Sequence, residues 1–133
     1  MSVALLVVTH GKVGQALLDA ADAMLAGTAL NVCAVAVSNQ CDPDEVAQHI
    51  GASITRINQG DGVLVLTDIY GATPSNIAMK HQADAAGIMM VAGVNLPMLI
   101  RVLNYPDLSI EQLLEKALSG GRDGIFRCQS DAG

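Results

Sequence analysis

The stretch that decides the fold is Val3-Ala4-Leu5-Leu6-Val7-Val8-Thr9-His10-Gly11-Lys12-Val13-Gly14. Its first six residues are apolar without alternation, which predicts a strand buried on both faces, as in a parallel sheet. The strand ends in Thr9-His10-Gly11, and an amphipathic helix pattern follows. Open α/β sheets bind their ligands at the carboxyl ends of the strands. We therefore expect His10 to be the functional residue that carries the chemistry.

The composition indicates one domain with an aliphatic core. Of the 133 residues, 51% are hydrophobic, yet the aromatic residues are only Tyr70, Tyr105 and Phe126. This length suits a single domain, which we place at residues 1–128, followed by a frayed tail at residues 129–133. The net charge is −6 and the seven basic residues form no cluster, which argues against nucleic-acid binding because that binding depends on phosphate neutralisation.

The three cysteines point to a cytoplasmic protein without a metal site. Cys33, Cys41 and Cys128 are odd in number and lack the spacing of metal ligands, so we expect free thiols. No signal peptide or membrane-spanning segment is expected either, and neither is a cofactor. His49 and His81 fall late on predicted helices, where we expect them to be solvated.

Strands and helices alternate along the chain, which predicts a parallel sheet with helices on its faces. Strands are expected at residues 3–8, 31–37, 62–67 and 87–94. Helices are expected after residues 12, 42 and 73, then at 98–103 and from 110 to about 120, where Gly120-Gly121 would end the last one. Residues 124–128 could form a final short strand.

Polar residues follow three of these strands: His10, Asp68 and Asn95. If the strand order is second-first-third-fourth, His10 and Asp68 lie side by side at the point where the helices change face. The carboxylate could then accept one ring N–H of the histidine, which fixes the tautomer and leaves the other nitrogen as nucleophile or base. Gly11 leaves room beside the histidine for a bulky group or a docking partner.

A possible anion site completes this constellation. Thr73 and Pro74 read as the N-cap and first residue of a helix, whose free N–H groups attract anions, and Gly71 and Ala72 keep the approach open. A nucleophilic nitrogen, an orienting carboxylate and an anion site suit phosphoryl transfer through a phosphohistidine. Taken singly, each feature has an ordinary structural explanation: a strand-end histidine, a turn aspartate and a helix cap.

Four motifs in order resemble the enzyme IIA domain of the mannose family, in the bacterial phosphoenolpyruvate:sugar phosphotransferase system. They are Val-Val-Thr-His-Gly, Thr-Asp-Ile-Tyr-Gly-Ala-Thr-Pro-Ser-Asn, Ala-Gly-Val-Asn-Leu-Pro-Met-Leu and Gly-Gly-Arg-Asp-Gly. The resemblance runs in register from Val3 to about Cys128. It implies a mostly parallel sheet whose final antiparallel strand, here Gly124 to Cys128, crosses to the other subunit of a homodimer.

The resemblance also implies roles for single residues. His10 would be phosphorylated on Nε2 by the histidine phosphocarrier protein and would pass the group to an enzyme IIB domain. Asp68 would accept from the histidine Nδ1–H. The phosphoryl group would be bound at Gly71, Ala72 and Thr73, with a rim formed by Thr9, Gly11, Tyr70 and Asn95.

Two alternatives stay open beside this hypothesis. One is the related phosphocarrier subunit of dihydroxyacetone kinase, which typically has Ser after the histidine where this chain has Gly11. The other is a non-catalytic regulatory module on a flavodoxin-like fold, which loss of His10 or Asp68 would have favoured. We expect no fused IIB domain, and the resemblance implies that stand-alone family members without a matching permease serve in regulation.

Overall fold

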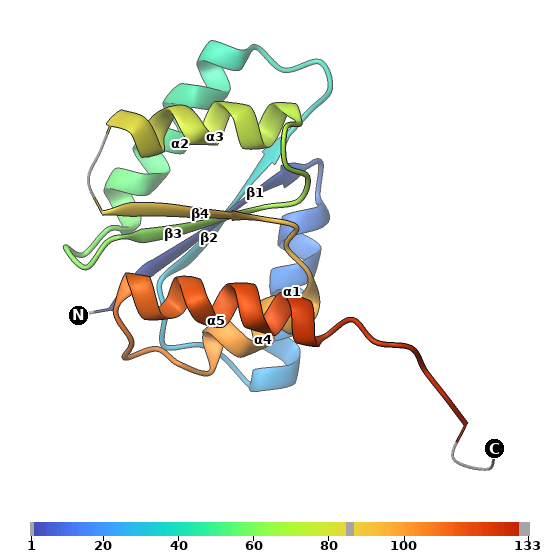
Figure 1. The fold of residues 1–133 in the computed structure, drawn as a ribbon. Helices are drawn as coiled ribbons and strands as arrows, with labels where there is room; N and C mark the ends of the chain where they lie inside the picture. Colours follow the sequence, from blue (N-terminus) through green and yellow to red (C-terminus); the bar gives the residue numbers. More distant parts are fainter. Residues whose placement is uncertain (1, 85–86, 131–133) are drawn as a thin grey trace.

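A computed structural model describes residues 2–84 and 87–130 (Figure 1). Part of the expected frayed tail, residues 131–133, therefore lies outside the described residues. In chain order the elements are β1 (Ala4–His10), α1 (Val13–Leu25), β2 (Val32–Val37), α2 (Pro43–Ile57), β3 (Val63–Thr67), α3 (Thr73–Asp84), β4 (Ile88–Ala92), α4 (Leu96–Leu103) and α5 (Ile110–Asp123).

The sheet has the expected order, β2-β1-β3-β4, and every pair is parallel. Helices α2 and α3 cover one face, and α1, α4 and α5 cover the other, as Figure 1 shows. The predicted α/β architecture is thus confirmed. In the register, Val8 pairs with Thr67, so His10 and Asp68 both lie just beyond the paired ends of β1 and β3.

The two central strands are buried on both faces, which explains their unbroken apolar sequence. Alternate residues of β1 enter different cores: Leu5 and Val7 pack with α1, α4 and α5, whereas Leu6 and Val8 pack with α2 and α3. All four side chains are at most 1% exposed. Burial on both sides fixes the register of β1, because a slip by one residue would exchange the two cores.

The start of α1 is held tightly against the end of β1. The Thr9 hydroxyl accepts a hydrogen bond from the Gly14 N–H at 2.7 Å, and Thr9 is 1% exposed. A Cβ atom on Gly14 would lie 2.9 Å from Cγ1 of Val7, closer than real contacts allow. Gly14 therefore permits the close approach that anchors the segment carrying His10.

The prediction that Gly120-Gly121 ends the last helix is wrong, because α5 continues to Asp123. Both glycines are buried within α5, where they face α4. A Cβ on Gly120 would lie 2.6 Å from Cβ of Arg101, and one on Gly121 would lie 2.8 Å from Cε of Met98. The pair is explained by close helix packing. At the same end of this helix pair, α4 begins two residues earlier than expected, because Asn95 caps it and donates to the Gly121 carbonyl.

The expected final strand at residues 124–128 is not formed. Residues 125–130, the last that the structure describes, are neither helix nor strand, and they lead away from the body of the domain (Figure 1). Ile125 and Phe126 are 76% and 77% exposed. A strand this short needs a partner strand to be stable, and within the described residues β4 pairs only with β3.

Replacement of Gly120 by alanine tests the packing of α4 on α5. Alanine is favoured over glycine within a helix by about 1 kcal/mol, but overpacking typically costs about 1–3 kcal/mol. We expect Gly120→Ala to lower the free energy of unfolding by about 1–2 kcal/mol in urea denaturation. Gly51→Ala in α2 is the matched control, because its Cβ would meet only the ring edge of His81, at 3.1 Å. A Gly120→Ala protein as stable as the wild type would contradict the packing argument.

Candidate active site

The ends of β1 and β3 place His10 against Asp68, as the sequence predicts. Oδ2 of Asp68 lies 2.9 Å from the backbone nitrogen of His10 and 2.9 Å from its ring Nδ1. Oδ1 accepts from the Ile69 N–H at 3.0 Å. Because an ionised carboxylate only accepts hydrogen bonds, Nδ1 carries the hydrogen of the neutral ring. Nε2 is then the nitrogen with a free lone pair.

The surroundings of Asp68 favour its ionised form. Its side chain is 14% exposed, and this burial raises the pKa of the carboxyl group. The hydrogen bonds from the His10 N–H and ring, the charge of the His10 ring when protonated and the Ile69 N–H all lower it, and together they outweigh burial. The pKa of Asp68 therefore lies below its ordinary value, and the carboxylate is ionised at neutral pH.

A cavity of about 240 Å³ opens beside His10. It is lined by His10, Val37, Ser38, Asn39, Cys41, Pro43, Thr73 and Pro74. Three segments thus meet there: the end of β1, the connection from β2 to α2, and the start of α3. The cavity brings the histidine and the predicted anion-binding helix start together.

The helix start itself differs by one residue from the prediction. The Ala72 carbonyl accepts the first helical bond, from the Asn76 N–H at 2.9 Å, so Ala72 occupies the cap position and Thr73 is the first helical residue. Thr73 is exposed, and Gly71 adopts a left-handed φ of +83° that lets the chain turn into the helix. First-turn N–H groups have no partner within a helix, so this end remains suited to an anion.

The residues expected at the rim lie in three different surroundings. Gly11, with a φ of +48°, leaves open space where a Cβ would be. Tyr70 is 76% exposed. Thr9 is buried beneath the site, where it anchors α1. Asn95 caps α4 by accepting from the Met98 N–H and donates to the Gly121 carbonyl, so it joins α4 to α5 and does not line the His10 cavity.

The connection after β2 contributes to the cavity in a way that the sequence analysis missed. Ser38 and Asn39 directly follow the strand paired with β1, at the same edge as His10. The Ser38 hydroxyl accepts from the Gln40 N–H at 3.1 Å, which shapes this turn. The sequence could have indicated this contribution. A strand expected to lie parallel to β1 has its carboxyl end at the same ligand-binding edge of the sheet.

The two other histidines lie outside the candidate site. His49 is exposed, as expected, but His81 is half-buried, and its Nε2 lies 2.8 Å from the Ala47 carbonyl oxygen. The expectation that His81 is solvated is therefore wrong: it packs α3 against α2. Within residues 2–84 and 87–130, no group of His, Cys, Asp and Glu could hold a metal ion, and no helix is long and apolar enough to cross a bilayer.

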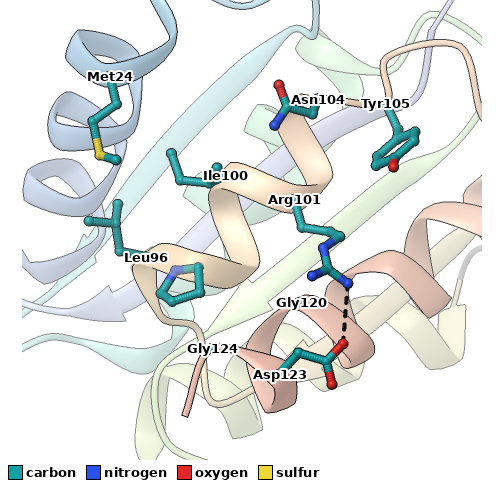
Figure 2. A pocket seen from close by; sticks show the side chains of 10 residues that line it. Met24, Leu96, Ile100, Arg101, Asn104, Tyr105, Gly120, Asp123 and Gly124 are labelled. Carbon is teal, nitrogen blue, oxygen red and sulfur yellow. Dashed lines mark hydrogen bonds and ion pairs between the residues drawn. The ribbon is translucent and has the colours of Figure 1, made fainter. Parts of the chain in front are cut away.

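A larger cavity of about 670 Å³, which His10 does not line, is drawn in Figure 2. It is a surface hollow between α1, α4 and the end of α5, bordered by Met24, Leu96 and Ile100 and by the ion pair between Arg101 and Asp123. That pair is 3.4 Å long and largely exposed, so it adds little binding energy. We locate the chemistry at His10, where a nucleophile, a carboxylate and a helix start converge.

Comparison with known proteins identifies the family of the chain. The sequence matches the family described as "PTS system fructose IIA component" over residues 4–118. The mannose-specific EIIAB component of the phosphotransferase system (PTS) from Escherichia coli (strain K12) is 31% identical over 127 residues, which are 94% of this chain and 39% of the relative. The fructose-specific EIIA component from Bacillus subtilis (strain 168) is 45% identical over 60 residues, 43% of this chain and 41% of the relative. The chain thus spans about two fifths of the length of these relatives.

Solved structures share the fold. The mannose/sorbose specific IIA subunit from Enterococcus faecalis superposes with a TM-score of 0.87 at 22% identity, covering 98% of this chain and 97% of that one. The component EIIA from Streptococcus agalactiae gives a TM-score of 0.81 at 21% identity, covering 94% and 96%. Both likenesses confirm the arrangement of strands and helices described above.

The lowered pKa of Asp68 predicts a pH-dependent stability. A group whose pKa is lower in the folded protein stabilises the fold above its unfolded pKa of about 3.9, and that stability is lost as the pH falls through the folded value. We expect Asp68→Asn to lower the free energy of unfolding by about 1–3 kcal/mol at neutral pH. The stability of this variant should also fall less than that of the wild type as the pH is lowered. Urea denaturation across the acidic range measures both effects. The exposed Asp61→Asn is the control, and equal acid sensitivity of Asp68→Asn and wild type would contradict the assignment.

Proposed function

The chain belongs to the family described as PTS system fructose IIA component, and we propose that it carries a phosphoryl group on Nε2 of His10. The observation that supports this most directly is the Asp68 contact, which holds the hydrogen on Nδ1 and leaves Nε2 nucleophilic. His10 also lines a cavity with Thr73, at the start of a helix suited to anions. We place this carrier in the cytoplasm, where its phosphoryl donor is found.

In the proposed step, the lone pair of Nε2 attacks phosphorus and forms a P–N bond. The bond between phosphorus and the donor's nitrogen breaks, and the donor retains that electron pair. The positive charge that develops on the ring is offset by Asp68, which keeps the Nδ1 hydrogen in place. The first N–H groups of α3 and the Thr73 hydroxyl would bind the phosphoryl oxygens, with Gly71 and Ala72 shaping the approach.

The partners follow from the family. We propose the histidine phosphocarrier protein as donor and an enzyme IIB domain as acceptor, or regulation through the phosphorylation state where no permease matches. The phosphocarrier subunit of dihydroxyacetone kinase and a non-catalytic module are not favoured, because the matching family and relatives are PTS IIA proteins.

Phosphorylation with phosphoenolpyruvate, enzyme I and the phosphocarrier tests the proposal. We expect one acid-labile, base-stable phosphoryl group per chain, with no incorporation into His10→Ala, because the adduct is a phosphohistidine on that residue. Radiolabel incorporation and intact-mass measurement follow the reaction.

Matched controls separate His10 from the other histidines. His49→Ala should be labelled like the wild type, and His81→Ala should be labelled once its folding is verified. Asp68→Asn should slow labelling by up to about ten-thousandfold, as tautomer-disrupting changes do in catalytic triads. Normal labelling of His10→Ala would refute the proposal.

We further propose that the protein is a homodimer in which residues 125–128 of each chain add a strand to the outer edge of the partner's β4. Three observations support this. β4 lies at an end of the sheet order, and the tail leaves its own domain with two large apolar side chains exposed. Gly124 has right-handed helical angles, and residues 125–130 then lead away from the body of the domain without forming a strand beside β4. Strand exchange is a low-cost route to a dimer.

Removal of the tail tests the dimer. A chain ending at Gly124 keeps all of α5 and should sediment as a monomer at concentrations where the wild type is a dimer. A variant lacking only residues 129–133 is the control and should remain dimeric. If the chain ending at Gly124 keeps the dimer mass, these residues are not the joint.

A further inference from the structure

A third cavity, of about 210 Å³, lies where α3 passes over the edge strand β4. We call it the edge cavity; it is lined by Tyr70, Ser75, Met79, Gln82, Met90 and Ala92. Met90 and Ala92 belong to β4, whose outer edge pairs with no other strand among the described residues. The cavity is therefore open toward whatever adds to that edge.

The lining of the edge cavity is incomplete in the single chain. The Ser75 hydroxyl is buried, in a residue 1% exposed, and it has no hydrogen-bond partner among the described residues. A buried hydroxyl without a partner costs free energy that an added polar group would recover. At the mouth, Tyr70 is 76% exposed although its ring is large and mostly apolar. Both features indicate that another segment covers this place.

One stretch of the chain, residues 70–75, supplies lining residues to both the edge cavity and the His10 cavity. Tyr70 stands between Asp68 and the Gly71–Thr73 segment, and Ser75 lies in the first turn of α3. In the sequence, the Gly71–Thr73 segment at the proposed anion site thus lies between two residues that line the edge cavity, Tyr70 and Ser75. A group that fills the cavity would hold this loop in place.

The exposed tail offers a suitable group. Along β4, Met90 packs toward α2 and α3, whereas Met89 and Val91 pack toward α4 and α5. A strand added beside β4 alternates in the same way, so Phe126 and Ile125 would enter opposite faces. Within its own chain, Ile125 borders a cavity lined by Val91 and Leu118, on the α5 face. We therefore assign the partner's Ile125 to the α5 face of β4. Phe126, the only phenylalanine of the chain, is then left for the α3 face.

We propose that the partner's Phe126 fills the edge cavity against Tyr70, so that each active site of the dimer is completed by the other chain. The inference rests on the dimer proposed above and adds that the tail acts on phosphoryl transfer. Phe126 is a positioning residue in this proposal: it fixes Tyr70, and through Tyr70 the Gly71–Thr73 segment, without contacting the reacting atoms.

A single tryptophan can report on the cavity, because the chain contains none. Tyr70→Trp places it at the mouth, and its emission maximum and quenching by iodide are measured across a dilution series that spans the dimer–monomer transition. We expect blue-shifted, protected emission in the dimer and red-shifted, quenchable emission in the monomer. Phe126→Ala added to this protein should expose the tryptophan even where sedimentation shows a dimer, whereas Ile125→Ala, on the opposite face, should not.

Two further readouts keep the test decisive. If Phe126→Ala is wholly monomeric, Phe126→Leu preserves an apolar contact and should give partial protection. Among dimeric proteins with Tyr70 intact, Phe126→Ala should slow labelling of His10 by about tenfold to a hundredfold, and Ile125→Ala should not slow it. Two results would overturn the inference. One is protection of the tryptophan from iodide that does not change with protein concentration, and the other is protection that is lost in Ile125→Ala and kept in Phe126→Ala. If the wild type is not phosphorylated, the proposed carrier function is refuted. The tryptophan emission would still decide where Phe126 lies.

Discussion

The interaction on which the site depends is the contact between the Asp68 carboxylate and His10. One oxygen of Asp68 accepts from both the backbone and the ring of the histidine, so the ends of β1 and β3 are tied where the sheet stops. This contact exists only because the two strands are neighbours, and they are neighbours because both are buried on both faces at the centre of the sheet. The hydrophobic effect that orders the sheet therefore also assembles the polar pair.

The loop after Asp68 lies between two regions, the His10 cavity and the outer edge of β4. Toward β2 it faces the His10 cavity, where it supplies the start of α3. Toward β4 it carries Tyr70 over the unpaired edge of the sheet. A sheet edge is a place where chains associate, and the carboxyl ends of parallel strands are a place where ligands bind. In this fold, the Ile69–Thr73 segment lies next to both, and this position is the physical basis of the proposed coupling between assembly and phosphoryl transfer.

The sequence was sufficient to predict the strand order and the pairing of His10 with Asp68, because unbroken apolar runs end at both residues. It was insufficient where one residue type serves two purposes. The Gly120-Gly121 pair resembles a helix stop, yet it permits close packing, and only the facing helix distinguishes these uses. His81 and the Ser38–Cys41 turn gain their roles from neighbours distant in the sequence. The expected final strand is not formed within the described residues, because residues 125–130 lead away from the domain and lie beside no strand.

The double acceptance by Asp68 has a consequence for signalling. A ring held by its Nδ1, on a backbone held by the same oxygen, has a single orientation before a phosphoryl group arrives. The proposed modification at Nε2 leaves both of these bonds intact. The loaded and unloaded states would then share one shape and differ in charge alone. A protein that tells them apart must do so by recognising about two negative charges at the mouth of the cavity, as phosphate-binding surfaces rich in arginine do.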